Sequence, residues 1–265
     1  MPVYKAEGVV LHRRALGEAD RAVTLFTREH GKVRASARGT RKTASRLAGR
    51  LEPFTHARFL LARGRSLDVI AQVDVIHAFA GLRGVLLRSA YASYVAELVD
   101  RFLPERDAQD GVFELVLDTL DALDRAGEDE VEVQALWFAL RLTSDLGYRP
   151  DFERCMACGR AVPQGAAGPV GAWAFNPGLG GALCPDCASS DAGALRVPPG
   201  ALATCGFLLR TPAGRAARLR LPPTSRREVS RLVQAHLEYH LDAKLKAPSV
   251  IGRLRESTER PPARR

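Results

Sequence analysis

The pattern of hydrophobic and polar residues divides this chain into a β-rich beginning and a helix-rich remainder. Within residues 1–80, short alternating apolar and polar runs are separated by turns that contain Gly, and this pattern predicts strands. The run VYKAEGVVLHRRALG is the first, and four more strands are expected over residues 22–27, 32–37, 57–62 and 68–75. A succession of five short strands predicts a small barrel, and the OB fold is a barrel with that number of strands.

Beyond Gly84 the apolar residues recur every three to four positions, which is the period of a helix with one buried face. Such helices are expected around residues 87–102, 112–123, 133–142 and 226–245. The end of the chain is polar and contains proline, so it has too little apolar surface to fold. We therefore expect residues 251–265 to form a disordered tail.

Four of the five cysteines form two matched pairs in a C-x2-C-x25-C-x2-C pattern: Cys155, Cys158, Cys184 and Cys187. Each x2 spacing lets a tight turn present two thiolates to one ion, and Gly159 supplies a residue that tolerates positive φ. Four thiolates complete a tetrahedral shell without water, so the pattern predicts one structural Zn²⁺. Two disulfides or a redox CxxC motif are the alternatives, but the first needs an oxidising compartment and the second uses a single motif.

These patterns predict an α+β protein in which an N-terminal OB-fold β-barrel precedes an α-helical domain that carries a four-cysteine zinc module. Residues 1–80 are expected to form a nucleic-acid-binding OB fold, and residues 81–150 an acidic helical domain. The zinc module is expected over 151–195, the C-terminal helical part of the helical domain over 196–250, and the tail over 251–265. Cys205 lies in the apolar run LATCGFLLR and is expected to be a buried core thiol.

The formal net charge of +9 is distributed unevenly along the chain. Residues 1–80 hold 15 Lys and Arg against 7 Asp and Glu, residues 81–150 hold 7 against 14, and residues 151–265 hold 17 against 9. The net charges of the three parts are therefore +8, −7 and +8. Basic ends favour nucleic acid or another polyanion as a partner. Arginine spread over solvated surfaces is the alternative for the chain as a whole.

The stretch SARGTRKTASRLAGR lies in the most basic part of the predicted barrel. No acidic residue occurs between Glu29 and Glu52. Because strands are expected on both sides, this stretch should be a loop on the barrel, where OB folds bind their ligands. Cations that follow the phosphates are one requirement for binding a single strand, and small residues between them leave the backbone accessible. The candidate binding residues are Lys32, Arg34, Arg38, Arg41, Lys42, Arg46 and Arg50.

Candidate catalytic chemistry is sparse in this sequence. No nucleophile–base pair and no phosphate-binding loop can be assembled, so we expect the protein not to be an enzyme. His236 and His240 are four residues apart, but Leu237 stands where a zinc-protease helix needs Glu, so a structural or partner-facing pair is expected. One helix face with three aspartates fits a solvated surface: Asp118, Asp121 and Asp124. Neither a long apolar span nor a secretion signal is present, which predicts a cytoplasmic protein.

Several motifs in order resemble the RecO family of bacterial recombination mediators. The N-terminal ones are EGVVL, GEADR, VTLFT, ARGTRK and RLAG followed by LEPF. GYRPDFERCMACGR and AFNPGLGGALCPDCA resemble the zinc module of that family, and HLEYHLDAKLKAPSVI resembles its final helix. The family often has Lys-Ser-Arg near the end of that last segment, whereas this chain has Lys246, Ala247, Pro248 and Ser249.

The resemblance implies a protein of recombinational DNA repair, in the RecFOR pathway, that is not an enzyme. Such a mediator binds single- and double-stranded DNA and anneals complementary strands. With RecR it helps RecA load on single strands coated by the single-stranded-DNA-binding protein SSB. The implied partners are DNA, RecR, the acidic C-terminal tail of SSB, RecF in some organisms and, indirectly, RecA, at the bacterial nucleoid. An RNA-binding OB/zinc protein, and a scaffold whose basic loop binds an acidic protein, are the alternatives.

Overall fold

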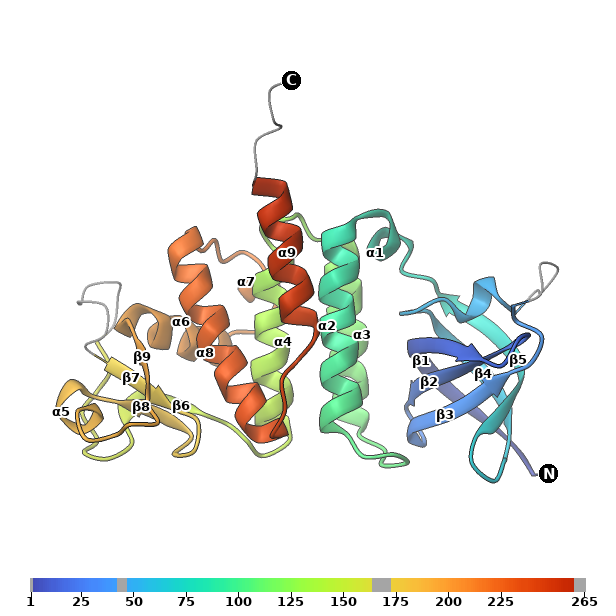
Figure 1. The fold of residues 1–265 in the computed structure, drawn as a ribbon, viewed down its shortest axis with the longest axis horizontal. Coiled ribbons are helices and arrows are strands. Elements are labelled where there is room, and N and C mark those ends of the chain that lie inside the picture. Colours follow the sequence, from blue (N-terminus) through green and yellow to red (C-terminus); the bar gives the residue numbers. More distant parts are fainter. Residues whose placement is uncertain (1, 42–46, 164–172, 260–265) are drawn as a thin grey trace, which may run out of the picture. The chain divides into compact units, whose positions relative to one another are not determined.

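The computed structural model describes residues 2–41, 47–163 and 173–259. The chain divides into two compact units, and the first contains both ends of the chain: residues 1–126 with 246–265 form the first unit, and residues 127–245 form the second (Figure 1). Within the described ranges, no helix is long and apolar enough to cross a membrane.

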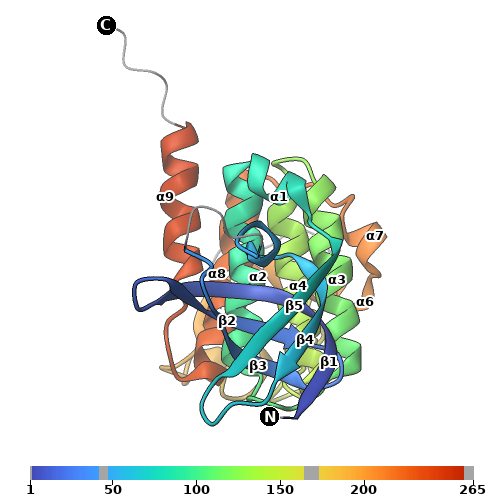
Figure 2. The same cartoon turned by 90° about the vertical axis from the view of Figure 1, so that its right-hand side faces the viewer.

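Five strands of the first unit close into a barrel in the order β1-β2-β3-β5-β4 (Figure 2). They are β1 (Val3–Leu16), β2 (Asp20–Thr27), β3 (Gly31–Ala37), β4 (His56–Ala62) and β5 (Asp68–His77). Neighbouring strands are antiparallel except β3 and β5, whose parallel pairing at Ala35–Asp68 and Ser36–Val69 closes the barrel. The structure confirms the expected OB-like barrel, and all five strands include the residues that the alternating pattern predicts.

The barrel interior is filled by the apolar half of each alternating pattern. Successive side chains of a strand point to opposite faces, so every second residue faces inward. Val23, Leu25, Phe59 and Leu61 are each at most 2% exposed. Burial of one such side chain contributes about 1.5–3 kcal/mol to folding. The alternation in the sequence is therefore the direct cause of the closed barrel core.

The described part of the first unit also contains the α-helices α1 (Ala80–Gly84), α2 (Leu86–Phe102), α3 (Asp110–Arg125) and α9 (Ala247–Glu259), with a short 3-10 helix, η1 (Gly49–Leu51), in the barrel. Phe113 of α3 packs against Phe26 of β2, with ring centroids 5.7 Å apart. The segment 81–150, expected as one acidic domain, is thus divided: α2 and α3 share a unit with the barrel, and the next helix belongs to the second unit.

The loop between α2 and α3 lies directly on the barrel. Gly31 adopts a φ of +60°, and a Cβ at this position would come within 2.0 Å of the carbonyl oxygen of Asp107. Arg106 donates from its backbone N to the Lys32 carbonyl (2.9 Å), and its guanidinium forms an ion pair with Asp68 (3.0 Å). Because Gly31 both turns the chain and permits this close approach, a larger residue here would displace the loop.

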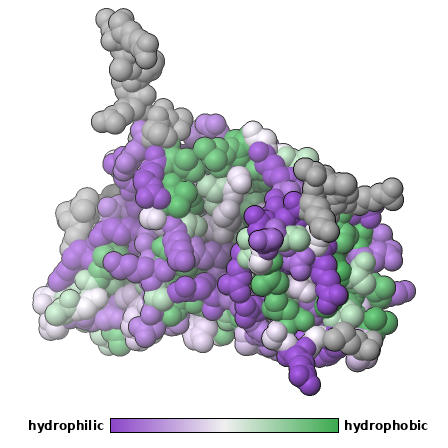
Figure 3. All heavy atoms as spheres, turned by 45° about the vertical axis from the view of Figure 1, so that its right-hand side comes forward, coloured by the Kyte–Doolittle hydropathy of each residue, from purple (hydrophilic) through white to green (hydrophobic). Residues whose placement is uncertain are grey.

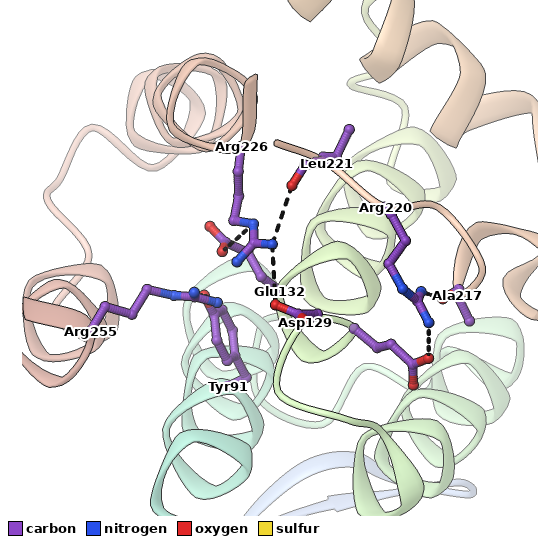
Figure 4. A network of polar contacts seen from close by, with 9 residues as sticks. Tyr91, Asp129, Glu132, Ala217, Arg220, Leu221, Arg226 and Arg255 are labelled. Atoms are coloured by element: carbon purple, nitrogen blue, oxygen red, sulfur yellow. Dashed lines mark hydrogen bonds and ion pairs between the residues drawn. The ribbon is translucent and has the colours of Figure 1, made fainter. Parts of the chain in front are cut away.

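Helix α9 occupies residues that were expected to be disordered, so that expectation is wrong for residues 251–259. Glu97 of α2 accepts hydrogen bonds from the backbone N–H groups of Lys246 (2.9 Å) and Ala247 (2.8 Å), which satisfies donors at the start of α9. Ile251 is 8% exposed, and the Arg255 guanidinium lies over the ring of Tyr91 (Figure 4). Residues 260–265 of the expected tail lie outside the described residues.

In the described residues of the second unit, a small sheet is combined with five helices. The sheet order is β6-β8-β7-β9, from β6 (Asp151–Cys155), β7 (Trp173–Asn176), β8 (Gly181–Leu183) and β9 (Leu195–Val197). The helices are α4 (Val131–Asp145), α5 (Pro185–Ala188), α6 (Pro199–Arg210), α7 (Ala213–Ala216) and α8 (Pro223–Leu241). Helix α6 lies in the part expected to be helical, although its own bounds were not predicted. It carries Cys205, whose full burial confirms a core thiol.

Candidate metal centre and nucleic-acid surface

Four cysteines converge at one edge of the small sheet. Cys155 is the last residue of β6 and Cys158 lies in the turn after it, whereas Cys184 follows β8 directly and Cys187 lies in α5. Because β6 and β8 are neighbouring strands, the two pairs meet although 25 residues separate them in the sequence. The four Sγ atoms all lie within 4.8 Å of one another, and those of Cys158 and Cys184 are 3.6 Å apart.

This spacing suits a tetrahedral thiolate site. Metal–sulfur bonds of about 2.3 Å at tetrahedral angles place neighbouring sulfurs about 3.8 Å apart, close to the 3.6 Å between the Sγ atoms of Cys158 and Cys184. The four cysteines could therefore hold one metal ion without rearrangement of the strands. The expected ligand set is brought together completely.

The backbone around the cysteines favours the thiolate form of one of them. Burial opposes ionisation of Cys155, but backbone N–H groups of Cys184, Cys158 and Ala157 outweigh it and lower the pKa of Cys155 to about 6. Hydrogen bonding with the Cys184 and Cys158 side chains raises the pKa of Cys187 to about 12. A bound cation would stabilise all four thiolates at once, so Cys187 would ionise as well as Cys155.

Each C-x2-C pair with its tight turn forms a knuckle, and the first knuckle, Cys155 to Cys158, ends in a glycine turn. Gly159 has a φ of +74°, as the sequence predicted, and its N–H donates to the Cys155 carbonyl (2.8 Å). Arg160 forms an ion pair with Asp186 (2.8 Å), which connects the turn after β6 to α5. These contacts connect the two cysteine pairs independently of a bound ion.

Among the proposed cations that the structure describes, Lys32 is the least accessible. It is 8% exposed, its Nζ lies 3.1 Å from Asp100 Oδ1 of α2, and it also donates to the Asp100 carbonyl. Asp100 accepts a further hydrogen bond from His12 (3.0 Å). Hydrogen bonding to His12, together with the charge of Lys32, lowers the pKa of Asp100 to about 2 despite burial. Lys32 thus joins the barrel to α2, and no sequence pattern indicates its partner 68 residues away.

Two further cations also have partners. Arg34 is exposed on β3 and lies 3.6 Å from Glu105. Arg50 is exposed beside η1, and its Nη1 donates to the carbonyl of Val73 on β5 (2.8 Å). The hydrogen bond of Arg50 orients the guanidinium without neutralising it, whereas Glu105 reduces the charge available at Arg34.

Arg38 and Arg41 lie at the end of β3, on the turn that follows it. Gly39 between them has a φ of +65° and donates to Asp20 (2.8 Å). The Arg41 N–H donates to the Ala19 carbonyl (2.9 Å), and its guanidinium donates to the Gly17 carbonyl (2.7 Å). This turn is therefore fastened to the β1–β2 hairpin. Both arginines are exposed and have no carboxylate within ion-pair distance in the described part of the chain.

The same edge of the barrel carries one cation that the sequence interpretation missed. Arg14 is exposed on β1 opposite Ala22, which in turn pairs with Ser36 of β3. Leu16, 39% exposed, lies two residues further on the same strand. Exposed apolar residues of this kind are common on this protein: Figure 3 shows hydrophobic side chains among hydrophilic ones on the visible surface. Outward alternation along β1 could have identified Arg14. We call Arg14, Arg38 and Arg41 the cationic edge. Lys42 and Arg46 lie outside the described residues.

The remaining candidates have structural surroundings. His236 is fully buried, and burial, with the charge of His240, lowers its pKa to about 4; its Nε2 lies 3.3 Å from the Thr143 hydroxyl. The ring of His240 stacks 4.6 Å from that of Tyr148. On α3, Asp118 is exposed, Asp121 pairs with Arg125, and Asp124 accepts a hydrogen bond from the Leu82 N–H (2.7 Å). The three aspartates do not converge on one point.

These features define a class of protein: an OB-like barrel joined to helices, with a four-cysteine module in its second unit. Comparison with known proteins agrees. Residues 1–79 match the family described as recombination protein O N terminal, and residues 83–248 match recombination protein O C terminal. The chain therefore belongs to the RecO family.

Relatives align with nearly the whole chain. The DNA repair protein RecO of Pelotomaculum thermopropionicum is 41% identical over 96% of this chain and 95% of its own length. The proteins of the same name from Symbiobacterium thermophilum and Anaeromyxobacter sp. (strain K) are 39% and 40% identical, over 97% and 93% of this chain and 100% and 95% of their own lengths.

Proposed function

We propose that this protein is a non-enzymatic DNA-binding mediator of recombinational repair. It binds single- and double-stranded DNA, anneals complementary strands and, together with RecR, helps RecA to load on SSB-coated single strands. The observation that carries the proposal is the cationic edge: exposed guanidinium groups without carboxylate partners among the described residues, on strand β1 and on the turn after β3 of an OB-like barrel. Membership of a family whose relatives are named DNA repair proteins supports DNA as the polyanion.

The cationic edge would act on the phosphates rather than on base sequence. Guanidinium groups neutralise backbone charge and release counterions, a contribution that is independent of sequence. Two complementary strands that are both partly neutralised repel each other less, so their bases can pair. Arg50, together with Lys42 and Arg46, which lie outside the described residues, is proposed to contribute further phosphate contacts. We assign Lys32 to the barrel–α2 connection instead, because its ammonium is already engaged by Asp100.

We propose that the four cysteines hold one Zn²⁺ with a structural role. Four thiolates leave no position for a substrate or water, so the ion would supply folding free energy rather than catalysis. This chain would contribute Cys155 and Cys158 from one knuckle and Cys184 and Cys187 from the other, and the ion would join β6 to β8. RecR, the SSB tail and, where present, RecF are proposed as protein partners on the ground of family membership alone.

An annealing assay tests the proposed function. Two labelled complementary oligonucleotides, bare or coated with SSB, are mixed with the protein, and duplex formation is followed by fluorescence transfer. We expect faster annealing with the protein, at a rate that falls as salt rises, and no dependence on ATP or Mg²⁺. Preferential competition by RNA would indicate an RNA-binding protein instead. Binding of acidic proteins without any binding of DNA would indicate a scaffold.

A further inference from the structure

A second arginine-rich stretch lies in the second unit, from the end of α6 to the middle of α8. Glu228 is the only acidic residue between its first and last arginines. The stretch is far from the barrel loop in sequence and belongs to a different compact unit. Its seven arginines are Arg210, Arg215, Arg218, Arg220, Arg226, Arg227 and Arg231.

Two of these arginines are used to fasten the stretch to α4 (Figure 4). Arg220 donates to Glu130 (2.6 Å) and to the Ala217 carbonyl (3.0 Å). Arg226 has only 14% of its side chain exposed; it lies 3.7 Å from Glu132 and 3.5 Å from Asp129. Acidic residues near the start of α4 thus neutralise both guanidinium groups, and these two arginines have a structural role.

Another contact fixes the beginning of the stretch. The indole N–H of Trp137 on α4 donates to the carbonyl of Thr211 (2.8 Å), and Ala216 of α7 is 1% exposed. Arg210 forms an ion pair with Glu153, and Arg231 with Glu228 (2.6 Å). The chain between Thr211 and Arg220 is therefore held at both ends. This reduces the conformational entropy that the segment would lose when a ligand binds to it.

Three arginines remain outside these contacts: Arg215, Arg218 and Arg227 are exposed, and no carboxylate of the described residues lies within ion-pair distance of them. The Arg218 N–H donates to the Arg215 carbonyl (3.2 Å). A turn of this i to i+3 type places the two side chains on the same side of the chain. The local sequence therefore presents a pair of unneutralised guanidinium groups to solvent.

The pair lines a hollow that also contains an aromatic ring. Phe207 of α6, half-buried, and Leu219 lie beside Arg215 and Arg218, and Gly214 completes the lining. The hollow, of about 630 Å³, lies within the range of ligand-binding sites. Cations beside an aromatic ring are the combination that binds single-stranded nucleic acid, because phosphates and bases are contacted together.

We propose that Arg215, Arg218 and Phe207 form a second binding surface for single-stranded nucleic acid, separate from the cationic edge of the barrel. The inference rests on the proposed annealing function, which it deepens: one chain would hold two strands at once, one on each unit. A single strand is favoured over an acidic peptide because the two arginines accompany a partly exposed ring. A peptide would instead require a well-packed pocket for a buried anchor.

The test uses two non-complementary oligothymidines of equal length, one with a donor and one with an acceptor dye, which cannot pair with each other. The full-length protein should bring the dyes together at stoichiometric concentration. We expect the variant Arg215→Ala/Arg218→Ala to lose most of this transfer, so that about tenfold more protein is required. It should still bind one oligothymidine through the barrel.

Two controls make the result specific. Arg65→Ala/Arg253→Ala removes the same charge from two exposed arginines outside both surfaces and should leave the transfer unchanged. Phe207→Leu keeps an apolar side chain but removes the ring, so it should weaken the transfer while circular dichroism stays as in the unchanged protein. Circular dichroism and zinc content confirm that each variant is folded.

The outcomes separate this inference from the proposed function. If the unchanged protein binds no oligothymidine, the proposed function itself fails. If it binds and joins two strands, and Arg215→Ala/Arg218→Ala does so equally well, only the second surface is refuted. Equal transfer by that variant combined with loss of binding to a fluorescent acidic peptide would assign the hollow to a peptide, and would also overturn the inference.

Discussion

Neutralising the cationic edge should change the salt dependence of DNA binding by a definable amount. Of the seven cations proposed from the sequence, Lys32 is buried against Asp100 and Arg34 faces Glu105, which leaves five. With Arg14 of the cationic edge, six cations are proposed for phosphate contacts. Each phosphate contact to a single strand contributes about −0.7 to the slope of log affinity against log salt, so six contacts correspond to about −4.2. The variant Arg38→Ala/Arg41→Ala removes two contacts and should give a slope of about −2.8.

The slopes translate into measurable affinities. A fourfold rise in salt, from about 50 to about 200 mM, should weaken binding of the unchanged protein about 340-fold and that of the variant about 50-fold. Fluorescence anisotropy of a short labelled oligothymidine at several salt concentrations measures both. The difference of about 1.4 between the slopes does not depend on how many other contacts exist, since those contribute equally to both proteins.

The control is again Arg65→Ala/Arg253→Ala, which has the same net charge as the variant and should keep the slope of the unchanged protein. A slope for Arg38→Ala/Arg41→Ala that equals the control would refute the assignment of the edge to phosphate contacts. If the variant has the slope of the control but binds more weakly at every salt concentration, the substitutions have changed the conformation of the turn instead. Thermal unfolding of the variants distinguishes that case.

Three further outcomes are expected. The pKa of Asp100 is lowered to about 2, so the contribution of its carboxylate to stability should be complete above about pH 4 and be lost as the pH falls towards 2. The variant Asp100→Asn should therefore unfold at a lower temperature at neutral pH. Its stability should also lack the part of the pH dependence that protonation of Asp100 causes. Cys184→Ser should reduce bound zinc from one ion per chain to substoichiometric amounts and destabilise the second unit, as measured by metal analysis and proteolysis; full zinc occupancy in this variant would contradict the four-thiolate site. Glu97→Ala removes the acceptor for the N–H groups that begin α9, so it should cost about 1 kcal/mol and increase amide exchange in residues 247–259, whereas Glu97→Gln should retain part of the effect.

The sequence alone determined the features that depend on local order. Alternation of period two predicted all five barrel strands, because a strand with one buried face must repeat every two residues. The cysteine spacing identified all four members of the cluster, since the geometry of a knuckle is confined to a few consecutive residues. The position of Gly159 with its positive φ follows from the same local constraint.

Only the tertiary structure decided which charged residues are free. Lys32 and Arg38 belong to the same basic stretch of the sequence, and nothing in that stretch distinguishes them. In the fold, Asp100 of α2 neutralises Lys32, whereas Arg38 lies on an exposed turn. In the same way, Arg220 and Arg226 are ion-paired to α4, while Arg215 and Arg218 face solvent. Helix α9 was missed because the carboxylate that accepts its first N–H groups lies about 150 residues earlier. Ion pairs and caps between distant segments leave no periodic trace in the sequence, so the availability of a charge is set by the fold.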